Sequence, residues 1–221
     1  MSKSKPISIA IDGPAGAGKS TVSRMLAEAM QFEILDTGAM YRAFAWLDIK
    51  NSYGFDLSVN ISNHIFEFDM TTGKMLVECD GLDITSDIRS VEVTAHVSKV
   101  AADGGVRKIA VTKQQEFVAH EILEGKSVIL EGRDIGTTVL PNASIKFFLT
   151  ADPQRRAERR ALEVGGEVED IASAIEMRDQ QDSSREVSPL IQAVDAILID
   201  ASDLDPSQVV EIMIEKITEL Q

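Results

Sequence analysis

The stretch GPAGAGKST, residues 13–21, lies between an apolar run, ISIAID (7–12), and a segment whose apolar residues have helical spacing. It completes the pattern G-x-x-x-x-G-K-[ST], with Lys19 and Ser20 at its end. Because glycine leaves the backbone uncovered, successive N–H groups can converge on phosphate oxygens, and the following helix adds its positive N-terminus. A glycine-rich turn with an incidental lysine is the alternative. The strand before the loop and the helix after it favour a nucleoside-triphosphate site, in which Lys19 reaches the β- and γ-phosphates and Ser20 ligates Mg²⁺.

Short apolar runs alternate with helical segments along the rest of the chain. Five runs are expected to be strands: 7–12, 33–36, 127–131, 144–150 and 196–200. Asp152-Pro153 and Asp205-Pro206 each place an acidic N-cap before proline at the first helical position. This alternation predicts an α/β fold of the P-loop three-layer kind, with a parallel sheet of about five strands and helices on both faces.

One region interrupts the alternation. Residues 65–84 read as short antiparallel strands around a turn at Thr72-Gly73-Lys74, and a helix follows them. We therefore expect residues 60–105 to be an insertion on a core made of 1–59 and 106–221.

Paired glycines in EVGGEVED (163–170) separate two helical segments. This composition predicts a mobile flap between them.

Composition limits the classes of function. The chain has 221 residues, a net charge of −14 and one cysteine, Cys79, so it has no internal disulfide framework. Broad nucleic-acid binding needs a basic surface, which this composition does not supply. No apolar stretch approaches the ~18 residues of a membrane span, and the N-terminal apolar run is too short for a signal peptide. We expect a cytoplasmic monomer that acts on small molecules.

Arginines cluster at 155, 156, 159 and 160, with Arg178 and Arg185 further along. A solvated basic face paired with Glu158 and Glu163 is one interpretation. In an acidic P-loop chain, however, transfer of a phosphoryl group between two anionic nucleotides needs cations on both sides. The N-K-x-D and D-x-x-G patterns of GTPase switches do not occur in the sequence.

Two further polar segments follow predicted strands, where ligands bind in open α/β sheets. In LEGRDIGT (130–137), Glu131 could hold the Mg²⁺ hydration shell, Arg133 a phosphate and Asp134 a base; a tight turn with a local Arg–Asp pair is the alternative. The second segment runs from Asp36 to Arg42, and its alternative is ordinary helix capping by Thr37.

The other reactive residue types give weaker signals. His64, His96 and His120 are scattered without metal-ligand spacing, so we expect surface or helix positions for them. Cys79 is expected to be a small apolar residue of the inserted strands.

Taken together, these motifs resemble the bacterial cytidylate (CMP) kinases of the nucleoside-monophosphate kinase group. The matching pieces, in the family's order, are IDGPAGAGKST (11–21), LDTGAMYRA (35–43), SKVAADGGVR (98–107), EGRDIGT (131–137), RDQQDSSREVSPL (178–190) and AILIDASDL (196–204). The resemblance implies transfer of the ATP γ-phosphoryl group to CMP or dCMP with Mg²⁺. It also implies that the insertion is an enlarged acceptor-binding domain, and that residues of about 156–170, with the arginines of 155–160, form a short lid over ATP.

The resemblance also implies site residues. ATP would be bound by Gly13, Pro14, Ala15, Gly16, Ala17, Gly18, Lys19, Ser20 and Thr21. CMP would be bound by Asp36, Thr37, Tyr41, Arg42, Ser98, Arg107, Arg133, Asp134, Arg178, Asp182 and Arg185. The catalytic cations would be Lys19, Arg133, Arg156, Arg160 and Arg185, and Mg²⁺ would be held by Ser20 and, through water, by Glu131.

Within the CMP set the family assigns separate roles. Arg42, Arg133 and Arg185 would hold the phosphate, Arg107 and Asp134 would read the cytosine, and Ser98, Arg178 and Asp182 would lie near the sugar. Two alternatives stay open at this point: a P-loop kinase with another acceptor (UMP, AMP or a shikimate-like molecule), and a P-loop regulatory module without turnover.

Overall fold

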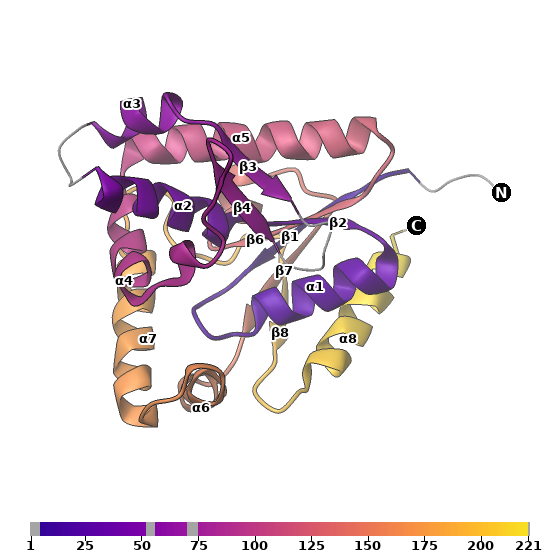
Figure 1. Ribbon diagram of the computed structural model, residues 1–221. Helices are drawn as coiled ribbons and strands as arrows, with labels where there is room; N and C mark the ends of the chain where they lie inside the picture. Colours follow the sequence, from indigo (N-terminus) through magenta and orange to yellow (C-terminus); the bar gives the residue numbers. More distant parts are fainter. Residues whose placement is uncertain (1–4, 52–55, 70–74, 221) are drawn as a thin grey trace. The chain divides into compact units, whose positions relative to one another are not determined.

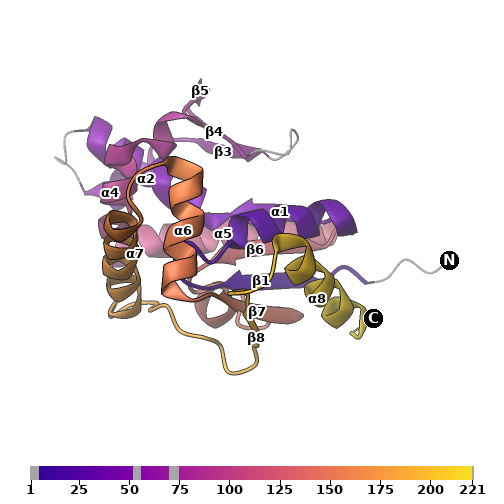
Figure 2. The same cartoon turned by 90° about the horizontal axis from the view of Figure 1, so that it is seen from below.

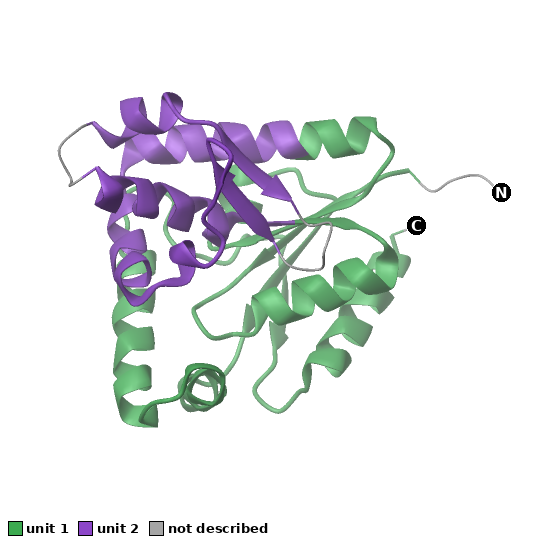
Figure 3. Cartoon of the chain, viewed as in Figure 1, with its two compact units in different colours: residues 1–34, 118–221 green, residues 35–117 purple. Residues whose placement is uncertain are grey.

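The computed structural model describes residues 5–51, 56–69 and 75–220. The chain divides into two compact units (Figure 3): unit 1 comprises residues 1–34 and 118–221, and unit 2 comprises residues 35–117. Unit 2 contains the predicted insertion and extends beyond it on both sides. The assignment of 60–105 to acceptor binding stays a prediction.

A five-stranded sheet is the centre of unit 1, with the order β2-β6-β1-β7-β8; the last two residues of β2 belong to unit 2. Its strands are β1 (Ser8–Asp12), β2 (Glu33–Asp36), β6 (Val128–Gly132), β7 (Ile145–Thr150) and β8 (Ile197–Asp200). Strand β1 lies in the middle and pairs in parallel with β6 and β7, and β7 pairs in parallel with β8. The apolar residues of β1 are fully buried, as expected for a strand covered on both faces. The predicted α/β fold is confirmed.

The helices of unit 1 are α1 (Lys19–Met30), α6 (Pro153–Val164), α7 (Val168–Ser183) and α8 (Pro206–Thr218), with one π-helical turn, η2 (Ile135–Val139). Of these, α6 and α8 start at the two predicted caps. The side chains of Asp152 and Asp205 cap α6 and α8 by accepting backbone N–H bonds. Helices α1 and α8 contact each other, and α6 lies beside α7 (Figures 1 and 2). Only residues 165–167 separate α6 from α7, so most of the predicted flap is helical.

Unit 2 combines helices with a small antiparallel sheet. Its elements are α2 (Thr37–Lys50), α3 (Leu57–Ser62), β3 (Phe66–Asp69), β4 (Leu76–Cys79), β5 (Leu82–Asp83), η1 (Asp87–Arg89) and α4 (Val91–Val100), and α5 (Gly104–Leu123) continues into unit 1. The sheet order β3-β4-β5 confirms the predicted antiparallel strands, whereas the turn predicted at residues 72–74 lies outside the described residues. The rings of Phe44 and Phe66 meet edge-to-face at 5.1 Å in the core.

Crossing a bilayer requires a helix that is both long and apolar. Within the described residues, no helix combines these two properties.

Gly13 marks the point where β1 ends and passes close to β7, and its substitution tests the fold there. A Cβ at Gly13 would lie 2.0 Å from the carbonyl oxygen of Leu149, a backbone atom that cannot move aside. We expect Gly13→Ala to lower the free energy of unfolding by on the order of 3 kcal/mol. Gly125→Ala is the matched control, because Gly125 also has a positive φ (+79°) but has no atom within 4 Å of the added carbon. That control should lose about 1 kcal/mol. Equal urea midpoints for the two variants would contradict this prediction.

Candidate active site

The loop between β1 and α1 has the backbone geometry of an anion-binding site. Gly16 and Gly18 adopt φ values of +73° and +90°, in the left-handed region that glycine enters without steric cost. Gly18 is the N-cap of α1, so the first N–H groups of that helix lie directly after the loop. A loop of this form presents backbone donors and a helix N-terminus to a polyphosphate.

Lys19 lies folded back against this loop. Its ammonium Nζ donates to the carbonyl oxygens of Gly13 and Pro14, each at 2.7 Å, and only 7% of the residue is exposed. Burial and the nearby Arg133 guanidinium lower the pKa of Lys19 well below its ordinary value, against the opposing charges of Glu131 and Asp12. The buried cation is therefore poorly compensated, and a polyanion in the loop would stabilise it.

Asp12, the last residue of β1, anchors the turn that follows β6. Its two carboxylate oxygens accept the backbone N–H groups of Ile135 and Gly136, at 2.8 and 2.7 Å. Burial raises the pKa of Asp12 to about 6, although these two N–H donors lower it. This contact fixes the predicted polar segment after β6 to the start of the P-loop.

Arg133 of that segment, Asp182 of α7 and Arg185, which follows α7, form an ionic group around one buried carboxylate. Asp182, 1% exposed, accepts from Arg133 Nε at 2.9 Å and also from Arg185. Two guanidinium groups that the sequence predicts to hold the acceptor phosphate thus share one carboxylate. Glu131 and Asp134, from the same segment, are also buried. Arg178 lies near enough for its charge to lower the pKa of Lys19.

The arginines of α6 separate into different environments. Arg156 is buried, and its guanidinium donates to the carbonyl oxygen of Ala15 in the P-loop and to Asp179 on α7. Arg155 and Arg160 lie on the surface and pair with glutamates three residues further on, at 3.4 and 2.8 Å. These two side chains therefore match the interpretation in which the arginines form a solvated basic face paired with Glu158 and Glu163. The predicted catalytic role of Arg160 remains a prediction.

Arg159 has a different set of partners. It donates to the carbonyl oxygens of residues 201, 202 and 204, which follow β8. This side chain thereby fixes the loop after β8 to α6.

The remaining predicted acceptor residues lie in unit 2. Asp36 caps α2 by accepting the N–H of Ala39 at 3.1 Å, so the alternative of capping by Thr37 is wrong. The Arg107 guanidinium lies over the ring of Tyr41 at 5.5 Å and donates to a backbone carbonyl at 3.0 Å. The structure thus brings two of the predicted residues together.

Arg42 and Ser98 are the last two members of the predicted set. Both are half-buried, on α2 and α4 respectively. Their predicted contacts with CMP stay predictions.

The donor atoms near the P-loop suit magnesium. Ser20 presents a hydroxyl at the start of α1, and Glu131 ends the apolar part of β6 as a buried carboxylate, opposite Ile11 of β1 in the ladder. Mg²⁺ prefers hard oxygen ligands together with water and phosphate oxygens, which these two residue types provide.

Two residues of this site, Asp12 and Asp179, are not among those predicted from the sequence. Asp12 ends the apolar run before the loop, and a carboxylate at the end of a central strand is the signal that could have identified it. Asp179 accepts the Ala15 N–H at 2.9 Å and pairs with Arg156. Its position three residues before Asp182 on one helix was visible in the sequence, but its partners were not.

The comparisons with known proteins agree with this geometry. The family model described as Cytidylate kinase matches residues 9–219. A cytidylate kinase of Streptococcus pneumoniae (strain 70585) is 44% identical over 217 residues, which are 94% of this chain and 95% of that protein. Homologues of the same description from other strains of that species have the same identity.

Solved structures that superpose on this chain share little of its sequence, so they show a similar fold and nothing more. An uncharacterized protein from Eubacterium ventriosum superposes with a TM-score of 0.57 at 14% identity and covers 97% of this chain and 99% of its own. A sugar kinase from Janibacter sp. gives a TM-score of 0.50 at 12% identity and covers 95% of this chain and 93% of its own.

The raised pKa of Asp12 makes a testable contribution to stability. An acid whose folded pKa exceeds its unfolded pKa favours the folded state at low pH, and this contribution is lost as pH rises from 3.8 through about 6. The variant Asp12→Asn cannot titrate there. We expect the wild-type free energy of unfolding, minus that of the variant, to fall by about 1 kcal/mol between pH 5 and pH 7. Urea titrations at several pH values measure it, and a difference that stays constant or rises with pH would contradict a raised pKa for Asp12.

Proposed function

The chain belongs to the cytidylate kinase family, and we propose that it transfers the γ-phosphoryl group of ATP to CMP or dCMP, giving ADP and CDP or dCDP. The observation that carries the proposal is the group of buried and half-buried cations in unit 1. There Lys19 lies in the P-loop, and the charges of Arg133 and Arg178 act on it. Phosphoryl transfer between two nucleotides brings several negative charges together, so it needs cations placed in advance.

The donor side is built from the loop and α1. Residues 13–21 and the N-terminus of α1 bind the ATP phosphates through backbone N–H groups, except at Pro14, which has none, and at Ala15, whose N–H donates to Asp179. When ATP binds, the ammonium group of Lys19 leaves the carbonyl oxygens of Gly13 and Pro14 and donates to phosphate oxygens instead. The negative charge of the phosphates then stabilises the buried ammonium group. Arg156 already contacts the loop through the Ala15 carbonyl oxygen and neutralises charge on the transferred group.

The acceptor phosphate is held by Arg133 and Arg185. Asp182 holds these two guanidinium groups in one place before CMP binds, so little side-chain entropy is lost on binding. The Tyr41–Arg107 pair of unit 2 supports recognition of the cytosine, because a buried guanidinium fixed against an aromatic ring is a rigid hydrogen-bond donor.

No general base is required for this reaction. The CMP phosphate is ionised at neutral pH, so its oxygen attacks without losing a proton. Ser20 and, through water, Glu131 would hold Mg²⁺, which would supply further neutralisation of phosphate charge when bound. The protein's own part is in-line positioning, fixed positive charge and exclusion of water, which would otherwise hydrolyse ATP.

Substitution of the two central cations tests the mechanism. We expect Lys19→Ala and Arg133→Ala each to lower kcat about 10²- to 10³-fold, because each removes a charge that stabilises the transition state. The control is Lys216→Ala, since Lys216 pairs with Glu219 at the surface of α8 and should leave turnover unchanged. Coupled ADP release measures turnover, and circular dichroism checks that the variants are folded. Wild-type turnover in either variant would reject the mechanism.

The acceptor is tested by comparing substrates side by side. We expect ADP formation from ATP and Mg²⁺ to depend on CMP or dCMP, with much weaker responses to UMP and AMP. Arg107→Ala should raise the KM for CMP by about tenfold or more while affecting the KM for ATP much less, because it removes a fixed charged donor worth roughly 1.5 to 3 kcal/mol. Equal rates with all four acceptors would contradict the proposed specificity but not the kinase activity.

A further inference from the structure

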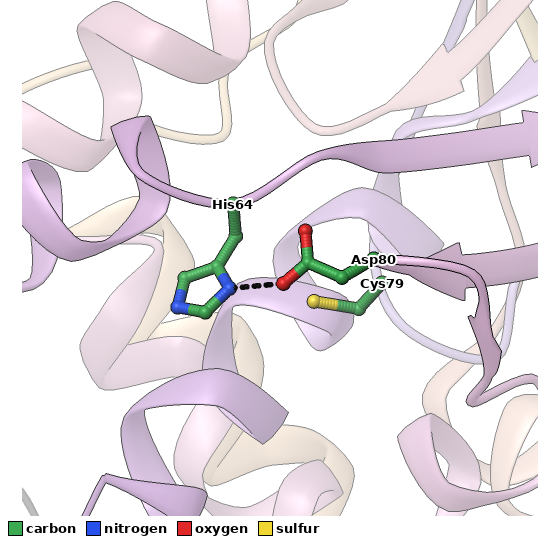
Figure 4. A group of neighbouring side chains, drawn as sticks. All are labelled: His64, Cys79 and Asp80. Carbon is green, nitrogen blue, oxygen red and sulfur yellow. Dashed lines mark hydrogen bonds and ion pairs between the residues drawn. The ribbon is translucent and has the colours of Figure 1, made fainter.

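Unit 2 contains a group of potential metal ligands that the kinase mechanism does not use. The side chains of His64, Cys79 and Asp80 offer a nitrogen, a sulfur and an oxygen atom, all within 4.8 Å of one another. Figure 4 shows the imidazole of His64 facing the carboxylate of Asp80, with the thiol of Cys79 beside them. Among the residues that the structure describes, this is the one group of three or more such side chains.

The local backbone explains how two consecutive residues can face the same point. Side chains along a strand alternate between the two faces of the sheet, so Cys79 and Asp80 would ordinarily diverge. Strand β4 ends at Cys79, and Asp80 adopts φ +51° in the turn to β5. Aspartate tolerates this left-handed conformation better than most residues. The turn therefore brings the carboxylate back toward the thiol.

Backbone contacts hold Asp80 beside the segment that carries His64. The Asp80 N–H donates to the carbonyl oxygen of Ile65, and the Ile65 N–H donates to Asp80 Oδ1, both at 2.8 Å. The second carboxylate oxygen, Oδ2, lies 2.5 Å from His64 Nδ1. One oxygen thus fixes the carboxylate in place, and the other faces the imidazole.

We propose that His64, Cys79 and Asp80 form a zinc site. Zn²⁺ binds imidazole nitrogen, thiolate sulfur and carboxylate oxygen at about 2.0 to 2.3 Å, so tetrahedral ligand atoms lie roughly 3.4 to 3.6 Å apart. Rotations that move the imidazole and carboxylate about 1 Å apart reach that spacing. A thiolate and a carboxylate also balance the two charges of the ion, with the histidine neutral. The site does not depend on the proposed kinase function.

The fourth coordination position opens toward a pocket. A pocket of about 370 Å³ is lined by all three side chains and by residues from the end of α2, including Trp46 and Lys50. It has room for the water molecule that completes a site with three protein ligands. The ammonium of Lys50, a cation of the same pocket, lies over the Trp46 ring at 5.6 Å. The bound ion would join the segment after α3 to the β4–β5 turn.

Cobalt is the first probe, because its bond to a thiolate gives a charge-transfer absorption band. The sequence has one cysteine, so such a band reports Cys79 alone. We expect the EDTA-treated full-length chain to bind one Co²⁺ with this band and Zn²⁺ to displace it. Excess Mg²⁺ should have no effect, because Mg²⁺ prefers an octahedral set of oxygen ligands.

Variants separate a three-ligand site from adventitious binding at the thiol. His64→Ala and Asp80→Asn should each weaken Co²⁺ binding by more than about tenfold. Asparagine keeps both the turn conformation and the acceptor for the Ile65 N–H. The matched controls are His120→Ala and Asp83→Asn, which change the same residue types outside the group and should bind as the wild type does.

Thermal unfolding gives a second readout that does not depend on cobalt. Zn²⁺ at a hundredfold excess over its Kd should raise the melting temperature of the wild type by about 5 to 10 °C, and it should leave the His64→Ala variant almost unchanged. Absence of the thiolate band, or equal Co²⁺ affinity in the His64 and Asp80 variants and the wild type, would overturn the zinc site. The group would then be a His–Asp hydrogen bond beside a buried thiol.

Discussion

The two hydrogen bonds that the Asp12 carboxylate accepts from Ile135 and Gly136 are the contact on which the rest of the site depends. They join the end of the central strand to the turn after its neighbour β6. The P-loop begins at the next residue after Asp12, and Glu131, Arg133 and Asp134 come from the segment that the turn holds. Burial makes the bonds strong but also makes the carboxylate costly to ionise, which is why the pKa of Asp12 rises to about 6.

Charge pairing explains how a chain with a net charge of −14 holds buried and half-buried arginines beside its P-loop. Carboxylates of α7 compensate three of these guanidinium groups: Asp179 pairs with Arg156, and Asp182 pairs with Arg133 and Arg185. An isolated buried charge would cost several kcal/mol, so these carboxylates maintain the cations in place before substrates arrive. Nucleotide phosphates offer the same guanidinium groups a second set of anionic partners, at little cost in reorganisation.

Much of this arrangement could be predicted from sequence, because its signals are local. The glycines and Lys19 of the P-loop, the Asp-Pro helix starts and the five apolar strands depend on near neighbours in the chain. Asp179 and His64 could not be predicted, because their partners come from distant segments. His64 lies 15 residues before Cys79, and only the left-handed backbone of Asp80 turns the two adjacent side chains toward it. Spacing rules for metal ligands assume regular helices and strands, so they do not detect a group assembled by one turn residue.

Helix α7 carries both anchoring carboxylates, and their separation along it has a consequence. Asp179 and Asp182 are three residues apart, a rise of about 4.5 Å along the helix axis. One holds the arginine at the P-loop, and the other holds the arginines predicted for the acceptor phosphate. Because the helix is rigid, the spacing between these two carboxylates stays the same when the whole helix slides or tilts. The spacing between the two sets of cations that they hold is therefore fixed as well. Insertion or deletion of a single residue between these positions would rotate one carboxylate away by about 100° and uncouple the two sets.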